Sequence, residues 1–209
     1  AWLTRCPLVI HEQNAVAGTT NKLLSKLATR VLLGYPINFG GHKSSFVGNP
    51  VREDITHVPA PEVRLRSRVG KLHVLVLGGS LGAKPINDLF PSVIKSIVKE
   101  QRPTVWHQAG PRHVDSVKNQ YRDVEVEVTI EAFIEDMAAA YSWADVVVCR
   151  SGALTVAELT AAGVASLLIP LPHAIDDHQT ENARWLEHGG AGKLLAQSKL
   201  TITGLAKDL

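Results

Sequence analysis

A run of valines, a glycine turn and a helix at residues 146–163 constrain the fold of this chain most. Residues 146–148 are all valine, which is typical of a buried parallel strand. The polar turn at residues 149–152 ends the strand, and residues 153–162 form a predicted helix that stops at Gly163. The first N–H groups of a helix have no intrahelical partner, and the helix dipole favours negative charge there. The stretch therefore predicts an anion site.

Glu158 makes this anion site more specific, because it lies about one turn into the predicted helix. Its side chain leans back toward the start of the helix. A carboxylate cannot hold a phosphate, but it can accept hydrogen bonds from ribose hydroxyls. A site for a diphosphate together with a site for a ribose predicts that the chain binds a nucleotide.

Strands and helices alternate along the whole chain, which is the pattern of doubly wound α/β proteins. Strands are expected at residues 7–10, 31–33, 72–77, 104–107, 124–130, 146–148, 165–169 and 192–195. Helices are expected at residues 19–30, 86–100, 111–121, 136–143, 153–162 and 179–188, and a loop at residues 34–45. Ligands bind such sheets at the carboxyl ends of the strands, so these ends are expected to share one cleft.

A segment rich in Pro and Arg, residues 53–70, is predicted to link two domains. Its basic run at residues 64–68 is interpreted as solvated linker, with a polyanion contact as the alternative. The glycine turn at residues 78–83 is either a second phosphate-binding turn or a close helix–strand packing turn. The chain lacks an initiator Met and starts almost directly with a strand, so we expect it to be a piece of a longer protein.

Composition excludes several classes of protein. The net charge of +2 over 209 residues is too small to indicate nucleic acid binding. Cys6 and Cys149 lie far apart in no metal-like spacing, which suggests a reducing, cytosolic setting. No His residues have ligand spacing either, so no metal site is expected. No apolar run approaches the roughly 18 residues of a membrane-spanning helix.

The predicted helix at residues 19–30 carries a repeating basic pattern. Lys22, Lys26 and Arg30 recur every four residues and would form one face, with Leu23, Leu24 and Leu27 on the other. A solvated face is the first interpretation. The alternative is contact with anionic lipid headgroups, with Trp2 as an interfacial anchor.

Six motifs in order carry a resemblance to a known family. They are His11-Glu12-Gln13-Asn14, Gly48-Asn49-Pro50-Val51-Arg52, Gly78-Gly79-Ser80, Arg150-Ser151-Gly152-Ala153-Leu154-Thr155, Asp176-Asp177-His178-Gln179 and Asn182-Ala183. The chain resembles the MurG family of peptidoglycan N-acetylglucosaminyltransferases, which have the GT-B fold of two Rossmann-like domains. The resemblance implies that residues 1–52 are the end of an incomplete first domain. Residues 71–209 would be the donor-binding domain without its final helices.

The resemblance also assigns binding residues. Asn14 and Arg52 would face the donor from the first domain, Ser80 would touch its phosphate, and the Ile134 backbone would read the uracil edge. The segment Ala153, Leu154, Thr155, Val156, Ala157 and Glu158 would surround the sugar and diphosphate, with Glu158 on the ribose. Gln179 and Asn182 would hold hydroxyls of N-acetylglucosamine.

The implied reaction transfers N-acetylglucosamine from its UDP donor to the C4 hydroxyl of the muramyl sugar of lipid I, with inversion, at the cytoplasmic face of the inner membrane. No metal or cofactor is expected. The general base would precede residue 1, so we expect donor binding without transfer. His11 is interpreted first as structural and second as a candidate base.

Three alternatives stay open. One is the nucleotide-binding half of a two-component transferase, and another is a GT-B enzyme with a different acceptor or a UDP-sugar epimerase. The third is a glycosidase carboxylate pair of Glu12 with Asp176 or Asp177.

Overall fold

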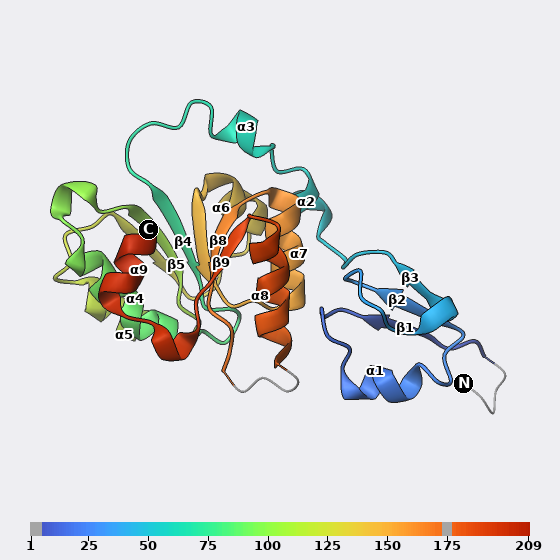
Figure 1. Cartoon of the computed structure of the whole chain (residues 1–209). Helices are drawn as coiled ribbons and strands as arrows, with labels where there is room; N and C mark the ends of the chain where they lie inside the picture. The colour runs from blue at the N-terminus through green and yellow to red at the C-terminus, as the bar shows by residue number, and fades with distance from the viewer. Residues whose placement is uncertain (1–5, 173–176) are drawn as a thin grey trace.

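The computed structural model describes residues 6–172 and 177–209, which form two lobes joined by an extended segment (Figure 1). The smaller lobe holds a parallel sheet of three strands in the order β1-β2-β3. These strands are β1 (Val9–Glu12), β2 (Arg30–Leu33) and β3 (Ser44–Phe46). Its small core consists of Ile10, Ala28, Val31 and Leu33.

The helix that follows β1 is shorter than the sequence pattern predicts. This helix, α1, spans Thr19–Leu24. The N–H of Thr29 donates to the carbonyl of Leu8 at 2.7 Å, so the chain has already turned back to pair with β1. Arg30 consequently begins β2, and the predicted helical face of Lys22, Lys26 and Arg30 is wrong. The leucines do not pack inward either, since Leu27 is 66% exposed.

The predicted loop at residues 34–45 is wrong at its end, because β3 begins at Ser44. This edge strand is three residues long and partly exposed throughout. Its sequence, Ser-Ser-Phe, has neither the apolar alternation nor the β-branched run that identifies a strand, so the strand could not be predicted from the local pattern. Its pairing with β2 brings the chain toward the second lobe.

The larger lobe is built on a parallel sheet of six strands, in the order β6-β5-β4-β7-β8-β9. The strands are β4 (His73–Leu77), β5 (Thr104–Gln108), β6 (Val128–Glu131), β7 (Val146–Cys149), β8 (Ala165–Leu168) and β9 (Gly192–Leu194). The first strand in sequence, β4, lies in the middle, and the chain reverses its direction of winding between β4 and β7. This is the Rossmann strand order, so the predicted doubly wound class is confirmed.

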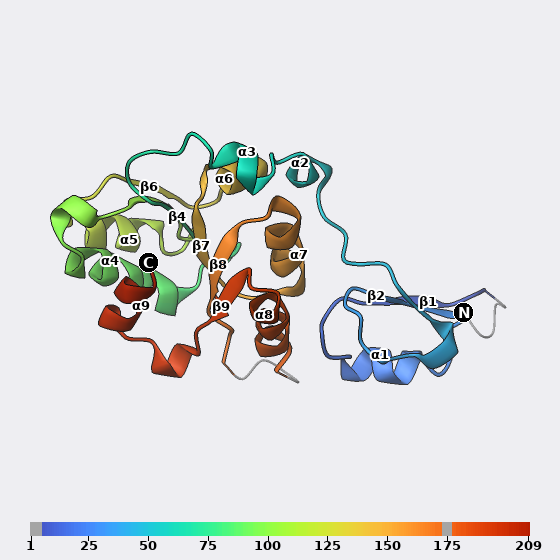
Figure 2. The same cartoon turned by 45° about the horizontal axis from the view of Figure 1, so that its top comes forward.

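Helices cover both faces of this sheet (Figure 2). They are α4 (Lys84–Ser96), α5 (Val114–Tyr121), α6 (Met137–Trp143), α7 (Ala153–Ala162), α8 (His178–His188) and α9 (Ile202–Asp208). Strand β4 serves both cores, because Leu75 and Leu77 pack toward α6, α7 and α8 whereas Val74 and Val76 pack toward α4. Helix α7 has the predicted bounds and ends at Gly163 with φ 60°.

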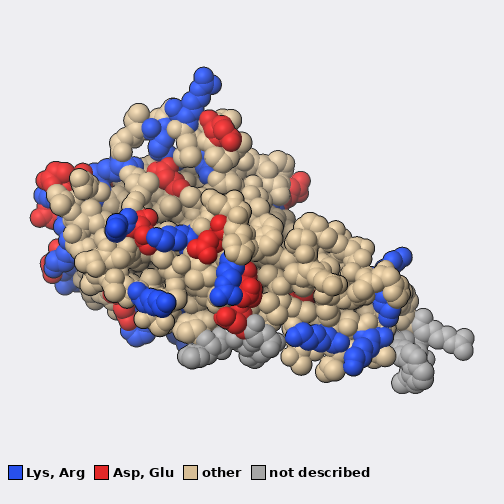
Figure 3. All heavy atoms as spheres, in the orientation of Figure 1, with Lys and Arg blue, Asp and Glu red and all other residues tan. Residues whose placement is uncertain are grey.

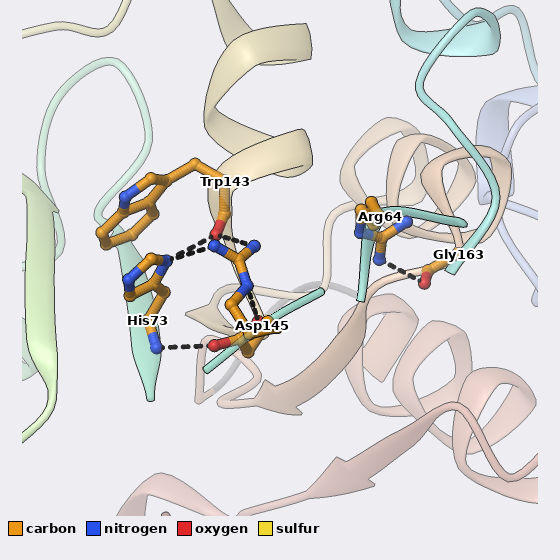
Figure 4. Close-up of polar contacts among 6 residues, drawn as sticks. Arg64, His73, Trp143, Asp145 and Gly163 are labelled. Carbon is orange, nitrogen blue, oxygen red and sulfur yellow. Dashed lines mark hydrogen bonds and ion pairs between the residues drawn. The ribbon is translucent and has the colours of Figure 1, made fainter. Parts of the chain in front are cut away.

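The segment between the lobes is attached to the larger lobe. It contains two short helices, α2 (Glu53–Thr56) and α3 (Pro61–Arg64). Ile55 is fully buried in the core shared with α6 and α7. The guanidinium of Arg64 donates to the carbonyls of Ala162 and Gly163 at 2.8 and 2.7 Å, so it caps the C-terminus of α7 (Figure 4).

Arg68 holds the same segment to the start of the sheet, where His73, Trp143 and Asp145 lie together (Figure 4). Its Nε lies 3.0 Å from Asp145 Oδ1, and its Nη2 donates to the Trp143 carbonyl at 2.8 Å. Asp145 also accepts the backbone N–H of His73, whose ring stacks on Trp143. The interpretation of this basic run as solvated linker is therefore wrong for Arg64 and Arg68, whose charges are engaged by the protein.

Substituting Arg68 with methionine is expected to lower the free energy of unfolding by about 2 kcal/mol, because Asp145 loses its cationic partner in a half-buried position. Urea denaturation followed by circular dichroism measures the change. The matched control is Arg66→Met, since Arg66 is exposed and a surface substitution changes stability by about 0.5 kcal/mol or less. Equal losses in the two variants would show that the Arg68 contacts contribute nothing to stability.

Candidate functional site

A cleft of about 190 Å³ lies at the carboxyl ends of β4, β5 and β7, beside the point where the sheet reverses its winding. Its walls include Gly79 after β4, Gln108 at the end of β5 and Arg150 after β7. Arg150 also lines a neighbouring cavity of about 310 Å³, which extends to Gln179 and the glycine turn after β4. The two hollows meet at the place where doubly wound sheets bind ligands.

The N-terminus of α7 opens into this region. Its N-cap, Gly152, provides no side-chain cap, and the neighbouring Ser151 hydroxyl donates instead to the Gln179 carbonyl at 2.7 Å. Arg150 adds a positive charge nearby, and its guanidinium is held by the carbonyls of Ile169 and Pro170 at 3.0 Å. Uncapped N–H groups and a fixed cation make this end of the cleft suited to an anion.

Glu158 lies further along α7, and its carboxylate contacts two other side chains. Its Oε2 accepts a hydrogen bond from the Tyr141 hydroxyl at 3.0 Å, and its Oε1 lies 3.3 Å from Arg52 Nη2. Burial, and secondly the neighbouring carboxylate, raise the pKa of Tyr141, which therefore donates as a neutral phenol. All three residues line the cleft, so Arg52, which directly precedes α2, reaches the site.

The segment Ala153–Glu158 does not face the cleft as a whole. Thr155 and Glu158 line the cleft, one turn apart, but Val156 and Ala157 line a separate cavity of about 230 Å³ between the lobes. Ala153 packs into the core, and Leu154 is 44% exposed. Because successive residues of a helix point about 100° apart, a six-residue segment cannot present every side chain to one ligand.

Two residues after β6, Phe133 and Ile134, line the cleft. Phe133 is 47% exposed, whereas the side chain of Ile134 is buried. The Ile134 N–H donates to Gln108 Oε1 at 3.0 Å. Ile134 is thus in the cleft wall, with its N–H already bonded to a side chain.

Asn14 and Asn182 join the two lobes directly. Asn182 Oδ1 accepts the N–H of Ala15 at 2.9 Å, and its Nδ2 donates to Asn14 Oδ1 and to the Ser151 carbonyl, both at 3.2 Å. The Asn182 side chain is completely buried. In this arrangement its amide serves the lobe contact, and it does not face a sugar. Gln179 is placed better, because it lines the larger cavity while its Oε1 accepts the N–H of Leu171.

His11 and Glu12 have structural roles. His11 Nε2 lies 3.1 Å from the carbonyl of Gly48, so this nitrogen carries the proton and donates to the carbonyl. Glu12 is 2% exposed, and both of its carboxylate oxygens accept hydrogen bonds, from residues that include Asn14 and Gly18. Burial alone would raise the pKa of Glu12, but these hydrogen bonds together lower it. The contact of His11 with Gly48 agrees with the structural interpretation of His11. Glu12 as part of a glycosidase pair is wrong, because its carboxylate is buried and fully hydrogen-bonded; Asp176 lies outside the described residues.

Both interpretations of the glycine turn after β4 have structural support. Gly79 has φ 74° and lines the cleft, with open space where a side chain would begin. Gly82, in contrast, packs against the backbone of Ala109 so closely that a Cβ would lie 2.3 Å from its carbonyl oxygen. Ser80 is exposed next to Gly79 at the mouth of the turn. The turn packs two strand ends together and leaves Gly79 to the cleft, whereas Ser80 is not among the residues that line it.

Within the described residues, neither a metal-binding cluster nor a reactive cysteine adds to this site. These residues contain no cluster of three or more His, Cys, Asp or Glu that could hold a metal ion. Cys149 lies in the wall of the cleft, but burial raises the pKa of its thiol to about 12. A thiol with that pKa is not a nucleophile at neutral pH.

Comparison with known proteins identifies the family to which this arrangement belongs. Residues 73–209 match the model for the glycosyltransferase family 28 C-terminal domain. The chain belongs to glycosyltransferase family 28. A family 28 relative from Alkalilimnicola ehrlichii, named UDP-N-acetylglucosamine--N-acetylmuramyl-(pentapeptide) pyrophosphoryl-undecaprenol N-acetylglucosamine transferase, is 53% identical over all 209 residues. The chain spans 58% of the length of that relative.

Solved structures agree with the family 28 assignment. The crystal structure of Acinetobacter baumannii MurG matches with a TM-score of 0.84 and 39% identity, over 99% of this chain and 58% of that one. The glycosyltransferase of kitacinnamycin matches with a TM-score of 0.62 and 20% identity, over 86% of this chain and 45% of that one, which shows the fold alone. The predicted GT-B class and the resemblance to the MurG family are confirmed.

Among the cleft residues that were not predicted from the sequence, three carry polar side chains that hydrogen-bond within the site: Gln108, Tyr141 and Arg150. Gln108 is the last residue of β5 and Arg150 comes directly after β7, and the carboxyl end of a strand by itself indicates a ligand-facing edge. Tyr141 lies inside α6 and reaches Glu158 from another element. No local sequence signal identifies a contact of that kind.

Proposed function

We propose that this chain forms the donor-binding part of an inverting transferase. The complete enzyme would move N-acetylglucosamine from UDP-N-acetylglucosamine to the C4 hydroxyl of the muramyl sugar of lipid I and so form lipid II. The names of the relatives in family 28 support this reaction. The observation that carries the proposal is one cleft that combines the uncapped start of α7, the carboxylate of Glu158 and the backbone of Ile134.

Each part of a UDP donor has a counterpart in this cleft. The diphosphate would lie at the N-terminus of α7, near Arg150, Gly79 and Ser80, where N–H groups and positive charge favour it. The ribose hydroxyls would donate to Glu158, and the uracil would reach the backbone of Ile134.

Arg52 supplies the charge that the transfer step requires. In this structure it pairs with Glu158, and its side chain is 48% exposed. A ribose that binds Glu158 would free the guanidinium for the nearby diphosphate. There, Arg52 and the α7 dipole would stabilise the negative charge that develops on the leaving UDP. This proposed chemistry involves no metal or cofactor.

The sugar would extend from the diphosphate toward Gln179 and the contact between the lobes. Gln179 would hold a sugar hydroxyl from the larger cavity. Asn14 and Asn182 would do so only after they release each other, because their amides are joined at 3.2 Å. We therefore propose that the sugar binds when the lobes separate slightly at this contact.

The general base and the acceptor site would lie outside this chain. We assign His11 a structural role, since its Nε2 donates to the carbonyl of Gly48. We expect the chain to bind the donor and to require the rest of the longer protein for transfer.

A peripheral location at the cytoplasmic face of the inner membrane is the second part of the proposal, since the acceptor is lipid-linked. Lys and Arg side chains gather along the edge of the smaller lobe that carries α1 (Figure 3). Exposed Leu23 and Leu27 lie beside Lys22 and Lys26 there, and a mixed surface of this kind suits anionic lipid headgroups. Trp2, the predicted anchor, lies outside the described residues, which contain no helix long and apolar enough to span a membrane.

Calorimetric titration with UDP tests the donor site. Glu158→Ala is expected to weaken UDP binding by about 10- to 100-fold, which corresponds to about 1–3 kcal/mol for a hydrogen-bonded charged partner. The control is Glu100→Ala, which removes an exposed carboxylate away from the cleft. Failure of the unsubstituted chain to bind UDP, or equal binding by Glu158→Ala, would show that the donor assignment is wrong.

Two further assays separate the alternatives. A UDP-sugar epimerase would convert free UDP-N-acetylglucosamine without an acceptor. In a two-component transferase, a separate polypeptide would restore transfer to lipid I. A single-chain transferase would instead be restored by joining the missing N-terminal segment.

A further inference from the structure

Tyr141 reaches the cleft from the core of the larger lobe. Its side chain is 1% exposed and belongs to the core that α6 shares with α7. The residue also lines the cleft, and its hydroxyl donates to Glu158 Oε2 at 3.0 Å. An aromatic side chain has few rotatable bonds, and close packing holds it in one orientation. The fold therefore fixes the position of this hydroxyl.

The second partner of Glu158 is held less firmly. Arg52 directly precedes α2, its side chain is 48% exposed, and its Nη2 lies 3.3 Å from Glu158 Oε1. An ion pair at an exposed position contributes little free energy, and a long arginine side chain has many rotamers. The two oxygens of Glu158 thus have different partners, because Oε2 meets a fixed donor and Oε1 meets a donor that can leave.

The orientation of the Glu158 carboxylate depends on such a fixed donor. The last torsion of a glutamate side chain has a broad distribution, and a ligand that must order a side chain binds more weakly. A carboxylate can accept about four hydrogen bonds. After Tyr141 has taken one of these positions, Oε1 and the other side of Oε2 remain for the two hydroxyls of a ribose.

We propose that Tyr141 is a positioning residue, which holds the Glu158 carboxylate in the orientation that the donor ribose requires. This inference rests on the proposed function, in which the ribose hydroxyls donate to Glu158. Tyr141 acts through Glu158 and does not touch the nucleotide. When Arg52 leaves Glu158 for the diphosphate, the Tyr141 hydroxyl keeps the carboxylate in place. Burial raises the pKa of Tyr141, so the hydroxyl remains a donor at neutral pH.

Tyr141→Phe removes the hydroxyl and keeps the ring. We expect it to weaken UDP binding, measured by calorimetry, by about tenfold. The affinity for 2′,3′-dideoxy-UDP, which lacks both ribose hydroxyls, should change by less than about twofold. A general distortion of the cleft would weaken both ligands equally. The matched control is Tyr121→Phe, which removes a buried hydroxyl that contacts His107 in the same lobe and should leave the ratio of the two affinities unchanged.

A double substitution tests whether Tyr141 acts through Glu158. In a Glu158→Ala chain, Tyr141→Phe should cause no further loss of UDP affinity, because the side chain that Tyr141 positions is absent. A further loss as large as that of the single Tyr141→Phe variant would show that Tyr141 contributes to UDP binding independently of Glu158, and would overturn the inference.

The outcomes separate this inference from the proposed function. If the unsubstituted chain binds neither ligand, or binds UDP no better than 2′,3′-dideoxy-UDP, the donor assignment of Glu158 is wrong. If it prefers UDP and Tyr141→Phe leaves that preference unchanged, only the role of Tyr141 is overturned. If Tyr141→Phe does not fold, 4-methylphenylalanine at this position fills the space of the hydroxyl without donating, and the same two titrations decide.

Discussion

Gly82→Ala is expected to lower the free energy of unfolding by about 3–5 kcal/mol, because it combines backbone strain with overpacking. Gly82 has φ 80°, a conformation that residues with a side chain rarely adopt. A Cβ at this position would lie 2.3 Å from the Ala109 carbonyl oxygen and 2.8 Å from His113 Cδ2. The carbonyl belongs to the backbone after β5, which can move only if the turn after β4 separates from it.

Gly79→Ala in the same turn is the matched control. Its φ is 74°, but nothing lies within 4 Å of a Cβ built there. We expect it to cost only the conformational part, about 1–2 kcal/mol. Urea denaturation of both variants, followed by circular dichroism, measures the difference. If the two variants lose the same free energy of unfolding, the backbone around Gly82 moves to accept a Cβ without any loss of stability.

The pair of glycines shows why a motif alone left this turn ambiguous. The sequence presents Gly78, Gly79 and Gly82 as one glycine-rich turn, and a phosphate-binding turn and a packing turn have the same composition. In three dimensions Gly82 meets Ala109, about thirty residues later in the chain, whereas Gly79 lines the cleft. The two roles are divided between neighbouring residues.

The larger lobe was predictable because its strands and helices follow regular periods. In β4, adjacent residues pack on opposite faces of the sheet, and in α7 the apolar residues and the final Gly163 mark the observed bounds. A six-stranded parallel sheet with buried strands leaves little freedom in such segments. The position of the cleft followed from the same rule, since ligands bind at the carboxyl ends of the strands.

The errors arose where contacts distant in sequence override a local pattern. The basic and leucine periods predicted a helix through Arg30, but pairing with β1 draws the chain into β2 after residue 28. The run with Arg64 and Arg68 has the composition of a solvated linker, yet both side chains bond groups more than seventy residues away. Composition carries no information about such partners.

Which residues line the candidate site was easier to predict than what their side chains contact. Glu158, Arg52 and Ile134 line one cleft, as the resemblance implies, but the same resemblance did not indicate that Arg52 and Glu158 pair with each other. It also did not show that Asn182 is buried against Asn14. Partners of this kind depend on the relative position of the two lobes, which a motif does not encode.

The second large effect is expected in mild acid and comes from His107 in β5. This side chain is fully buried, with Nε2 3.1 Å from Asn87 Oδ1 and Nδ1 3.3 Å from the Tyr121 hydroxyl. The amide nitrogen of Asn87 donates to the Ala109 carbonyl, so its Oδ1 is an acceptor and His107 Nε2 carries the proton. The neutral imidazole is thus satisfied, and burial lowers its pKa from 6.5 to about 3.

The direction in which pH changes stability follows from the protonation of His107 in the folded and the unfolded chain. Above pH 6.5 the imidazole is neutral whether the chain is folded or unfolded, so it contributes its full stability. As the pH falls from 6.5 toward 3, the unfolded chain binds a proton that the folded chain excludes, and stability is lost. The loss is about 1.4 kcal/mol per pH unit, or about 2 kcal/mol at about pH 5.

Urea midpoints at about pH 7 and pH 5 measure this loss, and His107→Gln separates it from all other titrating groups. The variant is expected to be less stable at neutral pH, but its loss on acidification should be smaller than that of the unsubstituted chain by about 2 kcal/mol. His188→Gln, at an exposed helix end, should retain the full loss. If His107→Gln loses as much stability in acid as the unsubstituted chain, His107 already binds a proton in the folded state. That result would contradict the expectation that a fully buried imidazole, bonded only to Asn87 and Tyr121 and without an acidic partner, stays neutral.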